Sequence, residues 1–533
     1  MPERRRLFVA WSIVLGAAIA HRLTLFLLHR RDLEALIAAN QVWYIFQYLP
    51  REMLRDHLFR AMLLLQQTPP VPNLLMGLAL KGFSWPAGVA QVLIGLQSLA
   101  SILTAAVLVH LLSVLYPRRV VLWTAVSLLF VLNTDLVVLE YDNMGQLVYE
   151  PLSMLSTLVI LDALVCLRRT GRLRWAVVAG IAMGLLVVTR ATWYVFPIPC
   201  LLLVAALAPM RRAAAVLACL VPILVLQGGW AVKNYAVYGV LSPTPSTWGG
   251  LHALAGLRAA GFAEKFQDSR REWRAVERGA PSTPSPSPQE ISDRDAAVQR
   301  SLGLTNPTLN TLALRITLAQ DQRDFFHFVL THPTTMLRKC WMAYHIFWRP
   351  IANFGSQFVA LFAVSNRITD PFDFPGIVRQ LLAGSLPDVH YLASGSHPLL
   401  SLDPKDKLLP HRYVPTNLYT WRRLEPFGLI IELVGVHLLL PLVGVLWAAD
   451  RLQHGWSAPP RFDPLRMAAL LVGTTVYGYL AVTVNLIETN ENMRYRLEVE
   501  PVIWVITLVC VTELARFLRA RREPAGLASL PAR

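Results

Sequence analysis

The sequence predicts an all-α polytopic membrane protein with about ten transmembrane helices. Of its 533 residues, 54% are hydrophobic and only 16% are charged, whereas roughly a quarter are charged in soluble domains. Mean hydropathy is +0.44. The apolar residues stand in blocks long enough to cross a bilayer rather than alternating along the chain. These features exclude an ordinary cytosolic globule and, for most of the chain, intrinsic disorder.

The first apolar block predicts a retained transmembrane helix over residues 7–28. Its run is too long for the h-region of a signal peptide, and no small-x-small cleavage site follows it. The same length criterion predicts the later helices. They are expected near residues 87–115, 120–138, 147–167, 175–190, 193–209, 213–231, 426–449, 466–487 and 499–518.

Two long outer segments interrupt the predicted helices. In the first outer loop, apolar side chains at near-helical spacing predict interfacial helices. The second outer loop is partly irregular: residues 281–288 are rich in Pro and Ser, and the aromatic stretch 325–348 either re-enters the interface or adds a span. The expected organisation is a first helix at 1–28, the first outer loop at 29–85, helices two to seven at 86–231, a long outer loop at 232–425, the last three helices at 426–518 and a cytoplasmic tail at 519–533.

The charge distribution predicts the topology. The net charge is +16 and the isoelectric point is about 10.0, which in a soluble protein points to nucleic acid. Here the excess stands in connections on one side of the bundle, while the short opposite turn at 139–146 has no Lys or Arg. The positive-inside rule therefore predicts that both termini are cytoplasmic and that the basic loops meet anionic headgroups rather than nucleic acid. These loops and the tail contain Arg118, Arg119, Arg168, Arg169, Arg172, Arg174, Arg211, Arg212, Arg451, Arg461, Arg466, Arg519, Arg521 and Arg522.

Cysteine placement and known motifs exclude several classes of function. Four of the five cysteines fall in predicted helices, which leaves Cys340 alone in an outer segment, so no disulfide or zinc framework is predicted. His110 stands inside a predicted helix without an identifiable partner, and simple packing is expected for it. No Walker, Rossmann, HExxH, GxSxG or CxxC motif is present, which removes support for ATPase, dehydrogenase, metalloprotease and common hydrolase activities. No cofactor is predicted.

Acidic and basic residues gather at the outer ends of the predicted helices. A carboxylate there can act as a general base towards an acceptor hydroxyl, and cations can hold a lipid phosphate or diphosphate as it leaves. Both halves of a lipid-linked transfer reaction are therefore represented. The acids are Asp135, Glu140, Asp142 and Glu150, and the cations are Arg190, Lys233, Arg494 and Arg496.

Each of these groups also has a purely structural interpretation. Glu140 is typical of a solvated cap or an ion-pair partner, whereas Glu150 stands inside a helix, where an unpaired charge is costly. Arg22, inside the first helix, either snorkels outward or pairs with one of the acids. Asp32, directly after that helix, is either an interfacial charge or a site residue.

Five local patterns, in order along the membrane part of the chain, resemble the GT-C superfamily of polytopic glycosyltransferases, in particular bacterial relatives of the dolichyl-phosphate-mannose protein mannosyltransferases. One resembles the segment that closes the family's first outer loop, and another the start of its fourth span. The others resemble a turn between spans, a signature after a later span and the entry into the last span. They are residues 66–77 (QQTPPVPNLLMG), 149–152 (YEPL), 189–192 (TRAT), 230–239 (WAVKNYAVYG) and 492–501 (NMRYRLEVEP). The central outer loop is not covered.

The resemblance implies an inverting transferase of the bacterial inner membrane. It moves a sugar from a polyprenyl-phosphate carrier to an acceptor on the outer face, without a metal. The family's usual base is an acid of the first outer loop, but the corresponding stretch here, residues 40–44, has none. The base is then either Asp32 or Asp56 elsewhere in that loop, or catalysis depends on the outer-turn acids Asp142 and Glu150. The third alternative is that transfer activity has been lost. Asp32 is the favoured base.

Two other classes of function stay open. A transporter or lipid flippase would use the same charges to line a pathway, but it needs them at mid-membrane depth rather than at the outer rim. An inactive GT-C-like scaffold is consistent with the missing acid of the first loop. The predicted partners are a polyprenyl-phosphate sugar, membrane lipids and an acceptor that is a protein, a lipid or a glycan, without nucleic acid.

Overall fold

The computed structural model describes most of the predicted membrane part of the chain. Every regular element in it is a helix and none of its residues form a strand, so the all-helical fold class is confirmed for the described part. The described residues are 3–39, 49, 51–65, 68–84, 87–132, 140, 149–238, 257, 261–262, 264–269, 323–348, 431–455, 461–487 and 495–522. The Pro- and Ser-rich stretch 281–288 lies outside them.

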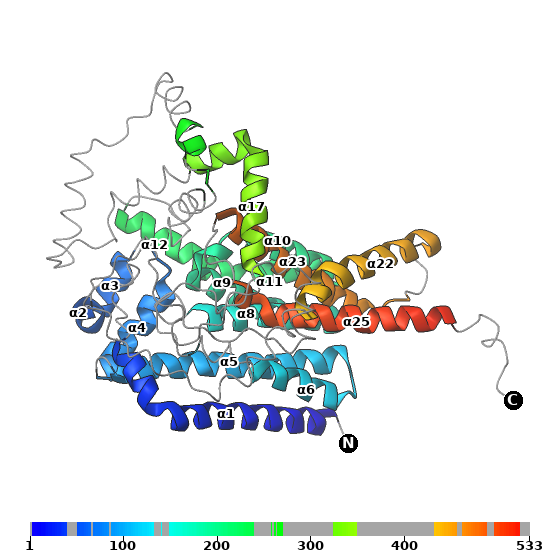
Figure 1. Cartoon of the computed structure of the whole chain (residues 1–533), viewed down its shortest axis with the longest axis horizontal. Coiled ribbons are helices and arrows are strands. Elements are labelled where there is room, and N and C mark those ends of the chain that lie inside the picture. Colours follow the sequence, from blue (N-terminus) through cyan, green and yellow to red (C-terminus); the bar gives the residue numbers. More distant parts are fainter. Residues whose placement is uncertain are drawn as a thin grey trace, which may run out of the picture.

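Long helices alternate with short ones along the chain (Figure 1). The first half contains α1 (Glu3–Ala39), α2 (Arg51–Asp56), α3 (Leu58–Leu64), α4 (Pro70–Gly82), α5 (Ala87–Leu115), α6 (Val120–Val131), α8 (Tyr149–Thr170), α9 (Leu173–Thr189), η2 (Ala191–Trp193), α10 (Pro197–Leu207), α11 (Arg212–Ile223), η3 (Leu224–Gly228) and α12 (Gly229–Tyr238). The second half contains α17 (Pro333–Phe347), η6 (Gly435–Leu439), α22 (Leu440–His454), α23 (Pro464–Ile487), η7 (Leu497–Val499) and α25 (Glu500–Arg522). The segments η3 and η6 are π-helical, and η2 and η7 are 3₁₀-helical.

Seven helical stretches of the described chain are long and apolar enough to cross a membrane, which makes this a multi-pass membrane protein. They are Arg4–Thr24, Gln91–Leu115, Glu150–Thr170, Arg212–Val237, Ile431–His454, Pro464–Ile487 and Leu497–Ala520. The other three predicted spans coincide with the shorter apolar helices α6, α9 and α10. The count of ten spans therefore stays a prediction.

Helix α1 is longer than the predicted first span. The sequence predicts an end at residue 28, but the helix continues through Asp32 to Ala39. Residues 29–39 contain good helix formers, and Arg30 and Arg31 stand three or four residues before Glu34, a spacing that supports a helix even where the sequence is polar. In the predicted first outer loop, α2, α3 and α4 follow, as the near-helical spacing of apolar residues indicates.

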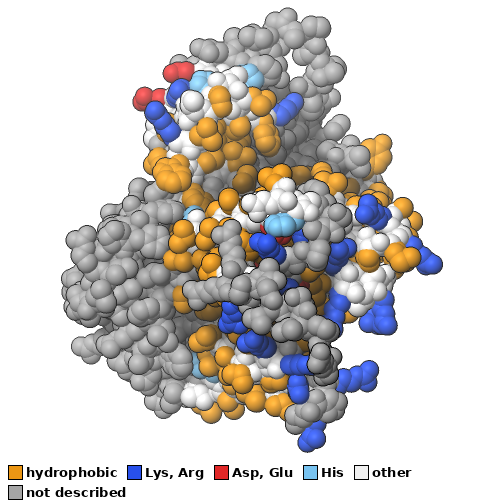
Figure 2. All heavy atoms as spheres, turned by 90° about the vertical axis from the view of Figure 1, so that its right-hand side faces the viewer, with side chains coloured by type: hydrophobic (Ala, Val, Ile, Leu, Met, Phe, Trp, Pro, Cys, Tyr) orange, Lys and Arg blue, Asp and Glu red, His pale blue; other side chains and the backbone are white. Residues whose placement is uncertain are grey.

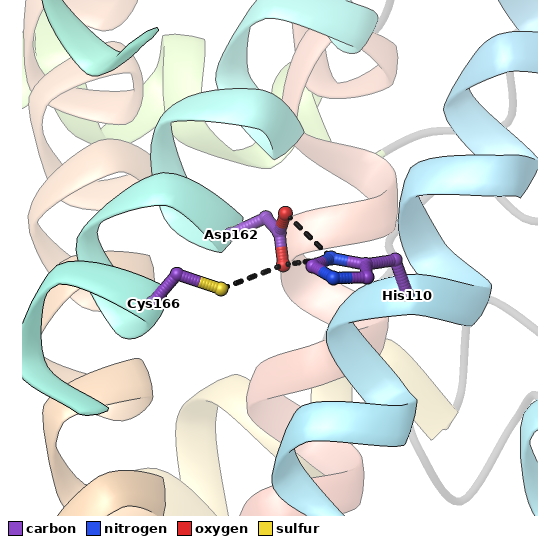
Figure 3. A group of neighbouring side chains, drawn as sticks. All are labelled: His110, Asp162 and Cys166. Carbon is purple, nitrogen blue, oxygen red and sulfur yellow. Dashed lines mark hydrogen bonds and ion pairs between the residues drawn. The ribbon is translucent and has the colours of Figure 1, made fainter. Parts of the chain in front are cut away.

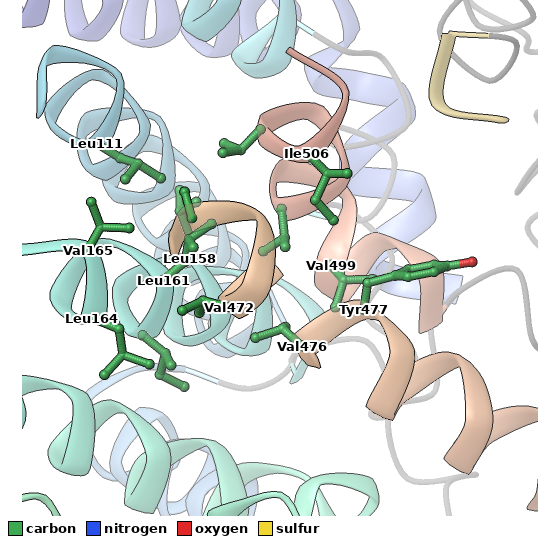
Figure 4. Close-up of a cluster of buried hydrophobic side chains, with 14 of the residues drawn as sticks. Leu111, Leu158, Leu161, Leu164, Val165, Val472, Val476, Tyr477, Val499 and Ile506 are labelled. Carbon is green, nitrogen blue, oxygen red and sulfur yellow. The ribbon is translucent and has the colours of Figure 1, made fainter. Parts of the chain in front are cut away.

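Helix α8 lies at the centre of the bundle and packs against α5, α9 and α23. In the candidate span of α8, 78% of the apolar stretch is buried inside the protein, compared with 22% in the candidate span of α1. Figure 4 shows the core that results, in which leucines of α8 meet valines of α23 and Val499 of η7. The peripheral α1 exposes large apolar side chains, as expected of a helix that faces lipid.

The bundle has two ends, which we name after the first and last residues of the candidate span in α8. At the Glu150 end, Arg190 follows the last residue of α9 and pairs with Glu150 at 3.2 Å. At the Thr170 end, His110 near the end of α5 stacks on Trp175 near the start of α9, with 6.2 Å between ring centroids. Helices α5 and α8 therefore run parallel to each other, and α9 is antiparallel to both.

Exposed arginines mark the Thr170 end. The start of α1 and the end of α25 both lie there (Figure 1). Figure 2 looks onto this side and shows Lys and Arg side chains projecting from it at several places, with few acidic side chains in view. The turns between α5 and α6, α8 and α9, and α10 and α11, together with the helix ends beside them, supply exposed arginines: Arg118, Arg119, Arg168, Arg169, Arg172, Arg174, Arg211 and Arg212.

Close packing of α9 on α11 depends on Gly180, which generates a first testable prediction. A Cβ atom at this position would overlap the backbone carbonyl group of Cys219. Gly180→Ala should therefore push the helices apart and cost about 1–3 kcal/mol. The matched control is Gly95→Ala on α5, where nothing lies within 4 Å of the added atom. In thermal unfolding of the detergent-purified protein at one fixed scan rate, only Gly180→Ala should lower the apparent Tm, and equal Tm values for both variants would contradict the packing.

Candidate functional site

The Glu150 end brings together the starts of α8 and α25 and the end of α9. Glu150 and Glu500 stand in the first turns of α8 and α25, each followed by a proline. Proline fits a first turn because no backbone N–H is needed there, and a carboxylate is favoured by the positive end of the helix dipole. Arg190 caps the C-terminal end of α9, where a cation is favoured for the same reason. Helix-end chemistry thus places acids and a cation at one level.

Arg190 bridges two carboxylates that come from different helices. Its Nη1 lies 3.2 Å from Oε1 of Glu150, and its Nε lies 2.6 Å from Oε1 of Glu498. The indole N–H of Trp193 donates to Oε2 of Glu498 at 2.7 Å, and the Tyr495 ring centroid lies 4.3 Å from the guanidinium carbon. None of the three charged side chains is more than 8% exposed. We call these five residues the arginine network.

The segment that carries Tyr495 and Glu498 also holds a second buried ion pair. Nη1 of Arg496 lies 2.7 Å from Oε2 of Glu432, and neither side chain is more than 4% exposed. The ring of Trp348, just after α17, lies 5.8 Å from the Arg496 guanidinium carbon. Neighbouring residues of one short segment therefore contact different helices, and the position of this segment fixes both arginines.

Polar contacts fix α17 against the same region. The fully buried Lys339 donates from Nζ to the carbonyls of residues 485–486 in the last turn of α23, at 2.8–2.9 Å. Such carbonyls have no partner within their own helix, and the helix dipole favours a cation beside them. The Tyr344 hydroxyl lies 2.7 Å from Nε2 of His437 and 2.6 Å from the Tyr477 hydroxyl. Helix α17 is thereby anchored to α23 and to the π-helical turn η6.

A third buried ion pair ties α1 to the bundle. Nη2 of Arg22 lies 2.7 Å from Oε1 of Glu140, and Ser98 on α5 donates to Oε2 of the same carboxylate at 2.7 Å. Arg22 also donates to the backbone carbonyl of Val131 at the end of α6. Of the two interpretations of Arg22, the structure shows pairing with an acid, and Glu140 is its ion-pair partner.

Lys233 lies on α12 and faces the first predicted loop. It donates from Nζ to the backbone carbonyl of Leu65 directly after α3, and Nζ lies 3.6 Å from the ring centroid of Trp230. In the same region Asn73 on α4 accepts from the backbone N–H of Leu49 at 2.9 Å and donates to Thr68 at 3.2 Å. Lys233 therefore joins two chain segments that are 168 residues apart in the sequence.

The remaining predicted site residues are placed only in part. Asp142 and Arg494 lie outside the described residues, although Arg494 directly precedes the described Tyr495. Asp32 lies within α1, and only its backbone is described. Of the predicted catalytic and phosphate-binding residues, the structure brings Glu150 and Arg190 into direct contact.

Asp56, the other first-loop acid, is exposed at the end of α2. Its carboxylate accepts from Nε and Nη2 of the adjacent Arg55, at 2.8 and 2.9 Å. These hydrogen bonds hold the pKa of Asp56 below its usual range. A carboxylate with a lowered pKa accepts a proton less readily, so this geometry makes Asp56 a weaker general base than an unpaired acid.

The structure also shows polar contacts that the sequence did not reveal. His110, expected simply to pack, has its Nδ1 2.8 Å from Oδ2 of Asp162, so that expectation is wrong. Glu498 and Glu432 pair with arginines at the Glu150 end, and Lys339 reaches α23 from the long predicted loop. In the sequence, a charged residue within or beside an apolar block indicates that this residue needs a partner. The sequence does not identify the partner.

Comparison with known proteins returned no match: no protein-family model, no curated protein and no solved structure matches this chain. The chemistry must therefore be argued from the residues themselves. Carboxylates, guanidinium groups, indoles and phenols, mostly buried, converge at the Glu150 end. Such a set can exchange a proton with a hydroxyl and can hold an anionic group, and both operations are strengthened where water is excluded.

The Arg22–Glu140 pair generates a prediction about stability. Replacing one partner leaves an uncompensated charge in a buried position, which typically costs about 3–5 kcal/mol. Arg22→Met and Glu140→Gln should each destabilise by that amount, whereas the double variant should lose much less than the sum. SDS denaturation followed by tryptophan fluorescence measures the free energy of unfolding of all four proteins.

The matched control is the exposed Arg51–Glu52 pair, whose atoms are 3.0 Å apart and whose side chains are 38% and 61% exposed. An exposed pair is worth about 0–1 kcal/mol, so the corresponding double-mutant cycle should show little coupling. If the Arg22–Glu140 cycle gave a coupling energy as small as this control, the buried pair would not be the contact that holds α1.

Proposed function

We propose that this chain is an inner-membrane glycosyltransferase of the GT-C type, which transfers a sugar from a polyprenyl-phosphate donor to an acceptor at the Glu150 end. One observation carries the proposal. Three of the five segments with family resemblance, 149–152, 189–192 and 492–501, are far apart in the sequence, yet they supply Glu150, Arg190 and most of the remaining arginine network. A motif resemblance arising by chance gives no reason for its charged residues to meet.

The two other segments with family resemblance also meet in part. Segment 230–239 contains Lys233, which donates to the carbonyl of Leu65, the residue directly before segment 66–77. The contacts of Asn73 with Thr68 and Leu49 then organise the start of α4 within that segment. This second convergence, between the predicted first loop and α12, supports the same interpretation.

The topology that accompanies this proposal has ten spans and both termini in the cytoplasm. The exposed arginines of the Thr170 end support it, because basic residues in short loops favour the cytoplasmic side. The Glu150 end then faces outward, where a lipid-linked donor and an envelope acceptor are both accessible. The acceptor is a protein, a lipid or a glycan, and residues of the long loop 232–425 would contact it.

In the proposed reaction the acceptor hydroxyl oxygen attacks the anomeric carbon of the sugar. The bond from that carbon to the phosphate oxygen breaks, polyprenyl phosphate leaves with the electron pair, and the hydroxyl proton passes to a carboxylate. Asp32 is the proposed base, with Asp142 and Glu150 as the alternatives. The cations stabilise the charge that develops on the leaving phosphate. The cations in this proposal are Arg190, Lys233, Arg494 and Arg496.

Both described arginines already contact carboxylates. Arg190 contacts Glu150 and Glu498, and Arg496 contacts Glu432. A phosphate must compete with these carboxylates for the guanidinium donors. Arg190 also has a positioning task in this proposal, because its contacts with Tyr495 and Glu498 hold the segment 495–500 in place.

The decisive experiment is a transfer assay with the purified chain in liposomes. Radiolabelled polyprenyl-phosphate sugars are supplied singly with a crude cell-envelope acceptor fraction, and labelled product and free polyprenyl phosphate are measured. Product from one donor supports the proposal. Asp32→Asn should abolish turnover if Asp32 is the base, and the exposed Asp56→Asn serves as its matched control. If labelled lipid crosses the bilayer and no product forms, the transferase proposal is wrong and the flippase hypothesis takes its place.

Arg496 provides the sharpest test of the phosphate contact. Arg496→Ala should lower kcat by about 10²–10³, the cost typical of removing one charge stabiliser from a transition state. Arg466→Ala is the control, because Arg466 also pairs with a buried glutamate, Glu513, at 2.7 Å, but at the Thr170 end. Both variants lose a buried ion pair, so only the first should reduce turnover per folded molecule. Equal turnover in the two variants would remove Arg496 from the site.

A further inference from the structure

A second polar cluster lies inside the bundle near the Thr170 end (Figure 3). His110 projects from α5 towards Asp162 and Cys166, which stand four residues apart on α8 and therefore on one face of that helix. Nδ1 of His110 lies 2.8 Å from Oδ2 of Asp162, and Sγ of Cys166 lies 3.9 Å from Oδ1 of Asp162. One ligand atom from each residue falls within 4.8 Å of the other two.

We propose that His110, Asp162 and Cys166 form a binding site for a divalent cation of the Zn²⁺ class. The donor atoms decide the class. Imidazole nitrogen, thiolate sulfur and carboxylate oxygen are the three ligand types that zinc uses in proteins, whereas Mg²⁺ and Ca²⁺ select oxygen alone. In the part of the chain that the structure describes, this is the one cluster of three such residues close enough to share an ion.

Charge balance favours a divalent ion at this place. The ionised Asp162 and Cys166 carry two negative charges, so binding a divalent cation gives a neutral site, which is the least costly state in a membrane interior. Arg169 and Arg174 are the neighbouring cations, and Arg174 lies 5.2 Å from the ring of Trp175, which itself stacks on His110. Their positive charge opposes an added cation, and both anionic ligands are needed to overcome it.

The site is partly exposed and lies near the Thr170 end. The His110 side chain is 28% exposed and that of Asp162 is 10% exposed, while Cys166 is buried. His110 is five residues from the end of α5, which corresponds to about 7–8 Å of helix. Three protein ligands with one exposed side leave the fourth coordination position for water.

Cation binding requires a small rearrangement with a defined proton balance. Ligand atoms about 2.0–2.3 Å from a tetrahedral ion are roughly 3.3–3.6 Å apart. The His110–Asp162 distance must therefore lengthen, and the Cys166–Asp162 distance must shorten slightly. The neutral imidazole turns its lone pair on Nδ1 to the ion and carries its hydrogen on Nε2, while the Cys166 thiol releases one proton to solvent. Binding should consequently weaken as the pH falls.

This cation site does not rest on the proposed transfer function. Asp162 is twelve residues beyond Glu150 on α8, which separates the two sites by about 18 Å along the helix. An ion held by α5 and α8 would cross-link the central helix to its neighbour. The test can therefore be made without any assay of sugar transfer, and either proposal can fail alone.

The test uses Co²⁺ as a spectroscopic probe of the intact, chelator-treated protein in detergent. We expect one Co²⁺ per chain, with the near-ultraviolet charge-transfer band of a thiolate ligand and the strong visible bands of tetrahedral coordination. Zn²⁺ should displace Co²⁺ at equimolar concentration, whereas a hundredfold excess of Mg²⁺ should not. Absence of the charge-transfer band in the wild-type protein overturns the proposal, and that result does not depend on whether any variant folds.

Variants then assign the ligands. Cys166→Ser, nearly the same size, should abolish the charge-transfer band, and Cys219→Ser is the matched control because Cys219 is also a buried cysteine in a helix but lies outside the cluster. His110→Gln and Asp162→Asn should each weaken Co²⁺ binding at least tenfold. A band that persists in Cys166→Ser, or that both cysteine variants lose, would overturn the assignment.

Discussion

The position of Arg190 between Glu150 and Glu498 is the constraint on which the Glu150 end depends. The three side chains come from the end of α9, the start of α8 and the short turn η7 before α25, and all are buried. An isolated charge in such a place costs several kcal/mol, so each of these residues is tolerated only while its partners stay within reach. Three helices are thereby held at a common level, and Thr157 on α8 adds a hydrogen bond to the backbone carbonyl of Glu498 at 2.7 Å.

The same contacts hold the segment 495–500 in place from several sides. Its aromatic, cationic and acidic side chains contact three neighbours in all. Tyr495 contacts the Arg190 guanidinium, Arg496 contacts the carboxylate of Glu432, and Glu498 contacts both Arg190 and Trp193. Rigid placement of this kind is what a site for charge stabilisation needs, because donors that are already oriented require no reorganisation during the reaction. Rigid placement of charges is also compatible with a transport pathway. Detection of a covalent transfer product distinguishes a transferase from a transporter.

The sequence predicted the helices well and their partners poorly, for one physical reason. The length of an apolar block indicates the extent of a helix, so the positions of the helices along the chain can be read from the sequence. Which helix a side chain faces is not readable, because it depends on contacts between residues as distant as Trp193 and Glu498, 305 positions apart. For that reason His110 was expected simply to pack, although the sequence contains Asp162 within another apolar block. Helix α1 extends beyond the predicted span because local helix propensity continues past the apolar run.

The central place of α8 follows from its own charges. A helix that faces lipid cannot offer partners to a carboxylate, whereas a helix surrounded by other helices can. Helix α8 carries Glu150 near one end and Asp162 nearer the other, and each finds its partner on a different neighbour, Arg190 after α9 and His110 on α5. Moving α8 to the periphery would leave at least one of these acids against hydrocarbon. Two acids on different faces of one apolar helix therefore require neighbours on several sides, which only the middle of the bundle provides.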